Sequence, residues 1–282
     1  MTMRRLWFVS NIASGSATHE ACEAIEASFA THGLALAGRT RFPDEPLPDA
    51  ATLDAAGADT LALFAGDGTI NTAVCRLAHW GGTLLILPGG TMNLLAKALH
   101  DTLDPREIVA RAQRARPVAL PVVEAGPHRA FVGLILGPAA SWVHAREATR
   151  KRRFAGLPRA LLHAWRRTFG RGIRIEAAGL RRHGYQAAYV TPRAGASLAV
   201  AAVDAREWRA ITQLGWSWLT GDWARAHAVD QAVTPTLQVL GHKPVLALFD
   251  GEPVMLEPAT VVTAGTSRPM FLDTRGDRER SA

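Results

Sequence analysis

The sequence predicts an α/β protein with an N-terminal doubly wound, mostly parallel sheet and a second, mostly antiparallel β-sandwich domain that carries helical insertions. Up to about residue 117, apolar runs of strand length alternate with stretches of helical spacing, which is the pattern of a parallel sheet with right-handed crossovers. From residue 118 onward, strand-like runs follow one another without regularly spaced helices, which favours antiparallel pairing. Two helical stretches, 139–170 and 204–223, interrupt this second pattern.

The chain is long enough for two domains. With 282 residues, of which 48% are hydrophobic, it can bury two cores of ordinary size. We expect an α/β domain over 1–117 and a β-rich domain over 118–261.

The elements of the first domain follow in order. The apolar run 6–9 predicts a first strand over 4–10, and apolar residues on one face predict a helix over 18–32 that ends at Gly33. The other expected strands are 34–39, 61–65 and 83–87, and the other expected helices are 49–56, 70–79, 94–99 and one that begins at Pro105 with Asp104 as its N-cap. In the second domain the expected strands are 118–124, 129–136, 172–175, 186–190, 197–203, 237–240 and 244–249.

An apolar run that ends in a glycine turn is the central feature of the sequence. The strand formers of Leu61–Ala65 stop at Gly66-Asp67-Gly68-Thr69, and a helix begins just after them. This order leaves backbone N–H groups at a helix N-terminus, where a phosphate can bind. The Asp67 carboxylate would repel a phosphate unless a cation lay between them, and Mg²⁺ accepts such oxygen ligands. The alternative is a tight turn in which Asp67 is only the N-cap of the helix.

The next strand ends in the same way. Thr83–Leu87 runs into Pro88-Gly89-Gly90-Thr91-Met92-Asn93, and a second helix follows. Each turn has an asparagine two residues after its threonine, Asn71 in the first turn and Asn93 in the second. Ligands of open α/β sheets bind beyond the carboxyl ends of the strands, so we expect both turns to face one crevice.

Four short motifs resemble those of bacterial diacylglycerol-kinase-like lipid kinases, in the same order along the chain. Residues 64–71 resemble the Gly-Gly-Asp-Gly-Thr signature shared by diacylglycerol kinases, sphingosine kinases, NAD kinases and phosphofructokinases. Residues 90–97 resemble the Gly-Thr-x-Asn-x-x-Ala-Arg motif of the lipid-kinase branch. Residues 10–15 resemble its Asn-Pro-x-Ser-Gly loop, and residues 249–252 resemble its Asp-Gly-Glu. The resemblance therefore covers nearly the whole chain.

The resemblance implies an ATP-dependent kinase that phosphorylates a hydroxyl group of a diacylglycerol-type or related lipid, with Mg²⁺ as cofactor. It implies that Glu252 is the general base and that Asp67 holds the metal together with the ATP phosphates. It also implies that 1–117 is an NAD-kinase-like nucleotide-binding domain, to which a C-terminal segment, about 262–273, returns, and that 118–261 is the domain for the acceptor substrate. The residues expected at the nucleotide are Asn11, Ser14, Gly15, Thr40, Ala65, Gly66, Asp67, Gly68, Thr69, Asn71, Gly90, Thr91 and Asn93.

The sequence departs from the family pattern at several positions. Ala65 replaces the first glycine of the signature, and Ile12 replaces the proline of the Asn-Pro loop. Leu94 stands where many members carry aspartate. The stretch 193–198 has no acidic residue where the family often has an Asp-x-x-Asp-Gly-Leu metal loop, so a structural magnesium is not expected there.

Positive charge is concentrated in one part of the chain. The net charge is +7, and residues 146–182 contain twelve Lys and Arg against two Glu, which is 12 − 2 = +10 and leaves 7 − 10 = −3 elsewhere. The helical stretches 139–170 and 204–223 carry tryptophans, and tryptophan together with arginine is typical of a membrane interface. With a lipid substrate implied, we expect peripheral contact between 146–171 and an anionic membrane; a solvated basic face is the alternative. No base-reading module accompanies the patch, so a nucleic acid partner is not expected.

The sequence favours a cytoplasmic protein, with contact at the inner face of the membrane. No apolar run reaches the roughly 18 residues of a membrane span, and the first residues lack the apolar region of a signal peptide. We expect Cys22 and Cys75 to be buried, reduced thiols rather than a disulfide.

Two other functions stay open. An NAD-kinase-like small-molecule kinase shares the glycine signature but fits residues 90–93 and 250–252 poorly, and the acid-free stretch 193–198 suggests a catalytically silent nucleotide- or lipid-binding homologue. By itself, Asp250-Gly251 is a strong hairpin signal that leaves Glu252 as an exposed strand residue. Diacylglycerol, phosphatidylglycerol, a sphingoid base and an isoprenoid alcohol all fit as acceptor, and the sequence sets neither the preferred nucleotide nor the oligomeric state.

Overall fold

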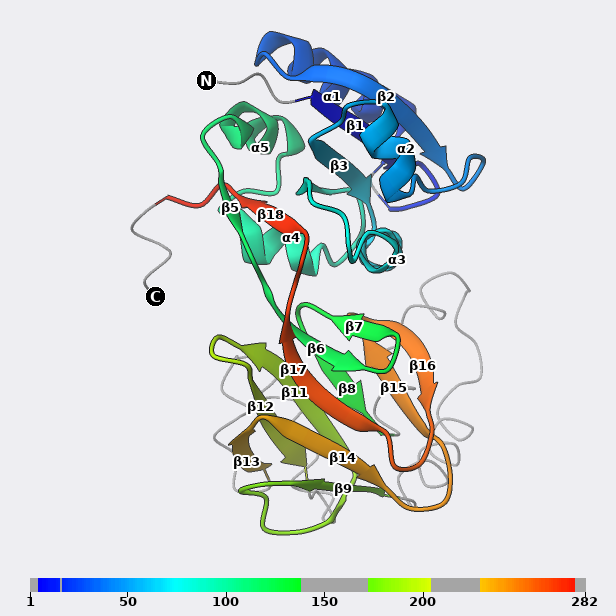
Figure 1. The fold of residues 1–282 in the computed structure, drawn as a ribbon, viewed down its shortest axis with the longest axis vertical. Coiled ribbons are helices and arrows are strands. Elements are labelled where there is room, and N and C mark those ends of the chain that lie inside the picture. The colour runs from blue at the N-terminus through cyan, green and yellow to red at the C-terminus, as the bar shows by residue number, and fades with distance from the viewer. Residues whose placement is uncertain (1–4, 16, 138–171, 204–228, 277–282) are drawn as a thin grey trace, which may run out of the picture. The chain divides into compact units, whose positions relative to one another are not determined.

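The computed structural model describes residues 5–15, 17–137, 172–203 and 229–276 (Figure 1). The chain divides into two compact units, one formed by Met1–Leu120 with Thr266–Ala282 and the other by Pro121–Gly265. The helical stretches expected at 139–170 and 204–223, and with them the membrane contact expected at 146–171, lie outside the described residues. None of the described helices has the length and the apolar character needed to cross a membrane.

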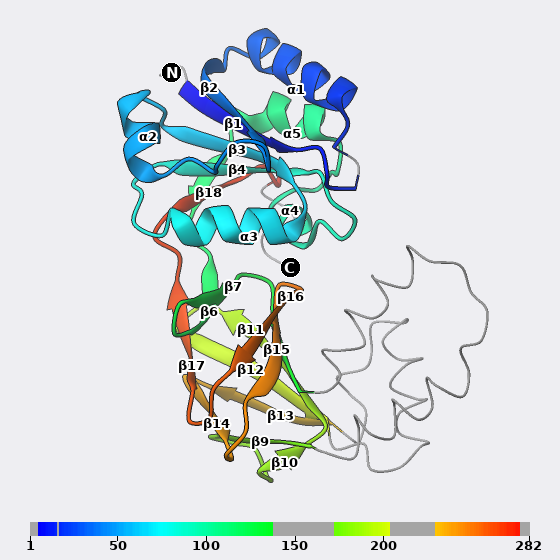
Figure 2. The ribbon, with the colours of Figure 1, turned by 90° about the vertical axis from the view of Figure 1, so that its right-hand side faces the viewer.

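A six-stranded sheet forms the centre of the first unit, in the order β2-β1-β3-β4-β18-β5. The strands pair in parallel except β5, which runs antiparallel to β18. Helices α1 and α5 lie on one face of the sheet and α3 and α4 on the other (Figure 2). The strands are β1 Arg5–Asn11, β2 Ala35–Phe42, β3 Thr60–Ala65, β4 Thr83–Pro88, β5 Arg116–Val118 and β18 Met270–Asp273, and the helices are α1 His19–Thr31, α2 Ala50–Ala55, α3 Asp67–Arg76, α4 Leu94–Leu99 and α5 Pro105–Ala112.

The sequence explains these elements locally. All six residues of β3 are buried, because helices cover both faces of a parallel sheet and its central strands become apolar throughout. Helix α1 begins where Thr18 Oγ1 accepts a hydrogen bond from Ala21 N, and α5 begins where Asp104 Oδ1 accepts one from Arg106 N. The first unit is therefore the doubly wound sheet that the sequence predicts.

The strand order of this sheet reverses between β1 and β3. From β1 the chain moves outward to β2, and it then returns to the other side of β1 to form β3. Connections at such a reversal leave in opposite directions, and ligands of open α/β sheets bind there, beyond the carboxyl ends of the strands.

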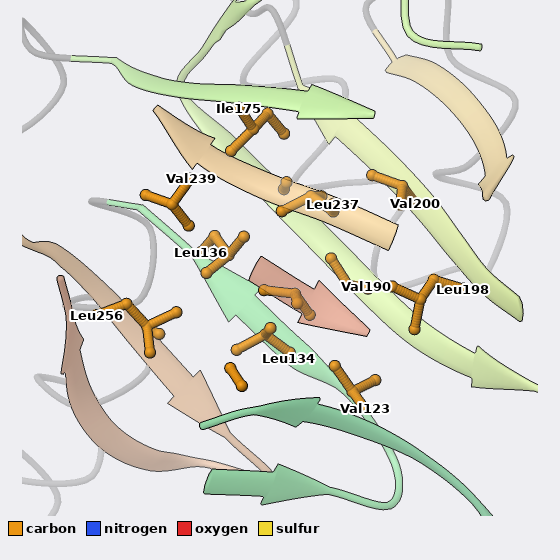
Figure 3. Close-up of a cluster of buried hydrophobic side chains, with 14 of the residues drawn as sticks. Val123, Leu134, Leu136, Ile175, Val190, Leu198, Val200, Leu237, Val239 and Leu256 are labelled. Carbon is orange, nitrogen blue, oxygen red and sulfur yellow. The ribbon is translucent and has the colours of Figure 1, made fainter. Parts of the chain in front are cut away.

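Two six-stranded sheets form the second unit. The first has the order β10-β9-β14-β17-β6-β7, and the second, antiparallel throughout, has the order β13-β12-β11-β8-β15-β16. Apolar side chains from both sheets form the core between them, as Figure 3 shows, so the predicted fold class is confirmed. The strands are β6 Pro121–Ala125, β7 His128–Ala130, β8 Leu134–Leu136, β9 Ile173–Ala177, β10 Gly184–Tyr185, β11 Ala187–Arg193, β12 Ser197–Val203, β13 Val229–Thr234, β14 Thr236–Leu240, β15 Val245–Phe249, β16 Glu252–Leu256 and β17 Val261–Thr266.

Two expected strands are each divided in the structure. The run 118–124 contains the end of β5, which belongs to the first unit, and most of β6, which belongs to the second. The run 129–136 contains β7 and β8, and a bend at 131–133 separates them because its amides bind a side chain from elsewhere in the sheet. β17 pairs with β14 in the second unit, so the chain rejoins the sheet of the first unit at β18.

A buried histidine joins three segments of the first unit. His100 follows α4 and is 4% exposed. Its Nε2 donates to the carbonyl oxygen of Ile86 on β4 (2.9 Å), so Nδ1 of the neutral ring accepts from Thr274 Oγ1 after β18 (2.8 Å). Burial lowers the pKa of His100 to about 4, with the carbonyl of Ile86 and nearby Asp273 acting in the opposite direction.

This histidine is expected to make stability depend on pH. An unfolded histidine has a pKa of about 6.5, so between pH 6.5 and 4 the unfolded state binds more protons than the folded state. The free energy of unfolding is therefore expected to fall by roughly 3 kcal/mol between pH 7 and 4 through this residue alone. Urea unfolding of wild type and His100→Gln at both pH values measures the difference. His100→Gln should reduce the pH dependence, the exposed His242→Gln control should not, and equal pH dependence in all three would contradict the expectation.

Candidate functional site

Three loops meet at the carboxyl ends of β1, β3 and β4. They are residues 11–15, 66–69 and 89–93, and the first two flank the reversal in strand order. Asn11 Nδ2 donates a hydrogen bond to Thr69 Oγ1 at 2.8 Å, which joins the first loop to the second. The structure thus brings both glycine turns of the sequence to one place, together with the loop that follows the first strand.

Glycines allow these loops to approach one another closely. A Cβ atom on Gly90 would lie 2.6 Å from Gly66 Cα, and one on Gly89 would lie 2.7 Å from the backbone nitrogen of Ala65, the last residue of β3. A Cβ atom on Gly15 would lie 3.1 Å from the carbonyl carbon of Gly90. Side chains at these positions would separate the loops. Their absence leaves bare backbone, which is the kind of surface on which phosphates bind.

Asn93 shapes the third loop from within. Its backbone is left-handed, with φ of 50°, which asparagine tolerates better than most residues. Its Oδ1 accepts from Gly90 N (2.8 Å) and its Nδ2 donates to Gly90 O (3.0 Å), so both ends of the side-chain amide hold the loop. The Gly-Thr-x-Asn pattern is therefore a requirement of this turn, which leads directly into α4.

Asp67 is the first residue of α3, yet its side chain binds the start of a different helix. The N-cap of α3 is Gly66, so the alternative in which Asp67 caps its own helix is wrong. Asp67 Oδ1 accepts a hydrogen bond at 2.8 Å from the backbone nitrogen of Leu94, which begins α4. This bond joins the second loop to the third.

The surroundings of Asp67 decide what kind of metal could bind. Burial raises the pKa of its carboxyl, and the backbone amides of Leu94, Leu95 and Asn93 act in the opposite direction. In the described part of the chain, no three acidic, histidine or cysteine side chains are grouped as metal ligands. This single carboxylate fits a Mg²⁺ that arrives bound to phosphates and keeps its waters, and it does not fit an ion held by protein side chains alone.

The other residues expected at the nucleotide lie close by in the first unit. Ser14 Oγ lies 3.5 Å from the position of a Cβ atom on Gly66, and Thr91 belongs to the third loop. Gly68 lies in the first turn of α3, where its carbonyl accepts from Thr72 Oγ1. Asn71 lies further along α3, and its Oδ1 accepts from Cys75 Sγ at 3.4 Å.

The two cysteines are free, but they differ in burial. Cys22 is buried, as expected, and burial raises the pKa of its thiol. Cys75 is only partly buried, because it lies on the more exposed part of α3.

Thr40 lies inside β2 rather than after it, and it lines a cavity of about 130 Å³. Its side chain is buried, and Trp7 Nε1 donates a hydrogen bond to its Oγ1 at 3.0 Å. Helix α1 supplies charged residues to the same cavity, including Glu26, which forms an ion pair with Arg39 at 3.5 Å. The remaining lining residues are Phe8, Ser10, Ile12, His19, Cys22, Glu23 and Arg41. It was not predicted from the sequence that charged residues line this cavity. The arginines on either side of Thr40 were the signal that could have indicated it.

Glu252, the expected general base, lies in the second unit at the start of β16. Phe249 and Glu252 pair across the β15–β16 hairpin, and the turn residues Asp250 and Gly251 have φ of 48° and 96°. Two positive φ values are typical of a type I′ turn. The Glu252 side chain is exposed, so the hairpin alternative describes the local geometry correctly, and the carboxylate is open to solvent.

The side chain of Asp250 binds the bend between β7 and β8. Its Oδ2 accepts from Phe131 N (2.8 Å), and its Oδ1 accepts from Val132 N and Gly133 N (2.9 Å each). Its own backbone nitrogen donates to Gly133 O (3.0 Å). This contact could not be predicted from the sequence, because the donors are backbone amides.

The second unit also contains a larger cavity, of about 340 Å³, over strands β11, β12 and β13. Tyr189, Thr191, Arg193 and Gln231 provide its polar lining, and alanines and valines provide the rest. Arg193 pairs with Ser197 where β11 turns into β12, in the stretch that lacks the acids of the family's metal loop.

The chain matches one protein-family model and resembles several solved structures. Residues 5–125 match the family model of the diacylglycerol kinase catalytic domain. The fold is similar to that of a diacylglycerol kinase from Bacillus anthracis strain Sterne (13% identity, TM-score 0.67) and of two candidate diacylglycerol kinases from the same strain (15% and 16% identity, TM-score 0.70 each). Each similarity covers 96% of this chain and 97% of the other. No curated protein matches the sequence significantly.

Proposed function

We propose that the chain, whose residues 5–125 match the family model of the diacylglycerol kinase catalytic domain, transfers the γ-phosphoryl group of ATP to a hydroxyl group of a diacylglycerol-type or related lipid. The observation that carries the proposal is the meeting of three glycine-containing loops at the reversal in strand order. Phosphoryl transfer requires positioning and charge neutralisation more than covalent chemistry, and such loops suit a triphosphate.

The loops of the first unit would hold the nucleotide. The backbone amides of 66–69 and 89–93 would bind phosphate oxygens, and the Asn11–Thr69 hydrogen bond keeps the first loop beside them. Thr40 and the cavity that it lines would receive a part of the nucleotide beyond the phosphates. Asp67 would hold Mg²⁺ together with the phosphates, and the ion, when bound, would neutralise charge on the transferred group.

Glu252 is the general base of the proposed reaction. The acceptor hydroxyl must lose its proton as its oxygen attacks phosphorus, and a carboxylate within hydrogen-bond reach can accept that proton. Glu252 suits this role because its carboxylate is exposed while its backbone belongs to a well-defined hairpin.

The proposed acceptor comes from a membrane, and the protein would work in the cytoplasm at the inner face of that membrane. The sequence supports this through the arginine-rich stretch 146–171, which contains Trp165 and would contact anionic lipid head groups. A magnesium-dependent lipid kinase needs only such peripheral contact, because the hydroxyl group of its substrate lies at the membrane surface.

The proposal is tested by incubating the purified chain with γ-labelled ATP, Mg²⁺ and a total bacterial lipid extract. We expect label in a chloroform-soluble product. Phosphorylation of NAD in a parallel reaction, with no lipid product, would favour an NAD-kinase-like activity instead. ATP binding without transfer to either acceptor would favour a catalytically silent homologue.

A further inference from the structure

Asp250 is fixed to a rigid part of the second unit by four hydrogen bonds. Three consecutive amides of the bend 131–133 donate to its carboxylate, and its own amide donates to Gly133 O. Hydrogen bonds to a charged acceptor are stronger than those between neutral groups. The hairpin turn that begins at Asp250 is therefore held directly against this bend.

The bend is itself packed from the other side. A Cβ atom on Gly133 would lie 2.6 Å from Tyr189 Cε2, so the backbone there is in close contact with the ring. At the base of the hairpin, Phe249 is buried in the core, and its ring lies 5.6 Å from that of His128 on β7. The bend and the end of β15, between which the turn is held, are thus both packed against neighbouring side chains.

Glu252 depends on that support for its position. The Glu252 side chain is exposed, and within the described residues no hydrogen bond or ion pair holds its carboxylate, so the position of the β15–β16 turn sets where this side chain begins. The Asp-Gly sequence suits the two positive φ values of the turn, and the hydrogen bonds to the Asp250 carboxylate then fix where that turn lies on the bend.

We propose that Asp250 is a positioning residue for Glu252: its carboxylate holds the β15–β16 turn against the bend 131–133 and so determines where the Glu252 carboxylate stands. This inference rests on the proposed function, in which Glu252 accepts the proton of the lipid hydroxyl. It assigns the first acid of Asp250-Gly251-Glu252 a role that requires contact with neither nucleotide nor metal.

Hydrogen exchange of the 282-residue chain, followed by mass spectrometry, tests whether the Asp250 carboxylate holds the turn against the bend. Asp250→Ala should accelerate exchange in peptides that contain 131–133 and 250–252. Asp250→Asn keeps one oxygen, which can still accept from Val132 and Gly133, so it should have a smaller effect. Unchanged exchange in Asp250→Ala would overturn the inference.

Asp230→Asn is the matched control. Asp230 is a buried acid on β13, at the opposite edge of the same sheet from β16, and it accepts from Arg181 N (2.7 Å) and Tyr185 Oη (2.6 Å). Its replacement should affect exchange near its own partners and leave 131–133 unchanged. Faster exchange at 131–133 in this control would show a general loosening of the unit and would also count against the inference.

Enzyme kinetics of the variants distinguish a role of Asp250 in positioning Glu252 from a role in stability alone. Asp250→Ala should lower kcat about 10- to 100-fold and leave the KM for ATP unchanged, Asp250→Asn should restore part of kcat, and Asp230→Asn should keep wild-type kcat. Wild-type kcat in Asp250→Ala, despite faster exchange, would remove the positioning role. Failure of the wild type to phosphorylate any acceptor would instead remove the proposed function, and the exchange data would still decide whether Asp250 holds the turn.

Discussion

Replacing Glu252 by glutamine is expected to lower kcat by about 10²- to 10⁴-fold and to leave the affinity for ATP unchanged. Glutamine keeps nearly the size and shape of glutamate but cannot accept the proton of the acceptor hydroxyl. The side chain is exposed, so the substitution should not disturb folding. Initial rates with γ-labelled ATP and lipid, together with calorimetric titration of nucleotide, measure the two quantities.

Glu257→Gln is the control for this substitution. Glu257 is also an exposed glutamate, and it lies just after the end of β16, so its replacement changes the net charge of the unit by the same amount. It should retain wild-type kcat. Equal activity of Glu252→Gln and wild type would show that another group accepts the proton.

Replacing Gly90 by alanine is expected to abolish the close contact of the second and third loops. The new Cβ atom would lie 2.6 Å from Gly66 Cα, a distance that backbone cannot accommodate without moving. Such overpacking should destabilise the first unit by about 1–3 kcal/mol and, because the loops separate, weaken ATP binding at least about tenfold. Thermal unfolding and nucleotide titration measure these effects.

Gly81→Ala provides the comparison in the same unit. No heavy atom lies within 4 Å of the position of a Cβ atom on Gly81, so this alanine should change neither stability nor ATP binding by much. If Gly90→Ala bound ATP as tightly as Gly81→Ala, the nucleotide would have to bind away from the three loops.

The fold could be predicted where the residues of a helix or strand themselves carry the pattern of that element. The continuous apolar run of β3 and the alternation of buried and partly buried residues in β12 are examples, since one lies between two helical layers and the other has one face on the core. The division of β7 from β8 could not be predicted. It depends on the carboxylate of Asp250, which lies 119 residues from Phe131 in the sequence.

In the candidate site, too, features set by neighbouring residues could be predicted, and contacts between residues far apart in the sequence could not. The two glycine turns were recognisable because each follows its own strand, and parallel strands bring their carboxyl ends together. The hydrogen bond from Leu94 N to Asp67 could not be predicted, because it joins residues 27 positions apart and its donor is a backbone amide. The charged lining of the cavity beside Thr40 was missed for a similar reason, since α1 and β2 supply it jointly.

The place of β18 has a consequence for biosynthesis. This strand, Met270–Asp273, lies between β4 and β5 and leaves the ribosome after every other strand of that sheet. Until then, β4 lacks one neighbour and β5 has no strand beside it, although every other strand of that sheet has already been made. The second unit, whose strands all precede β18, can therefore complete its folding first, and the N-terminal sheet closes only after β18 has been made.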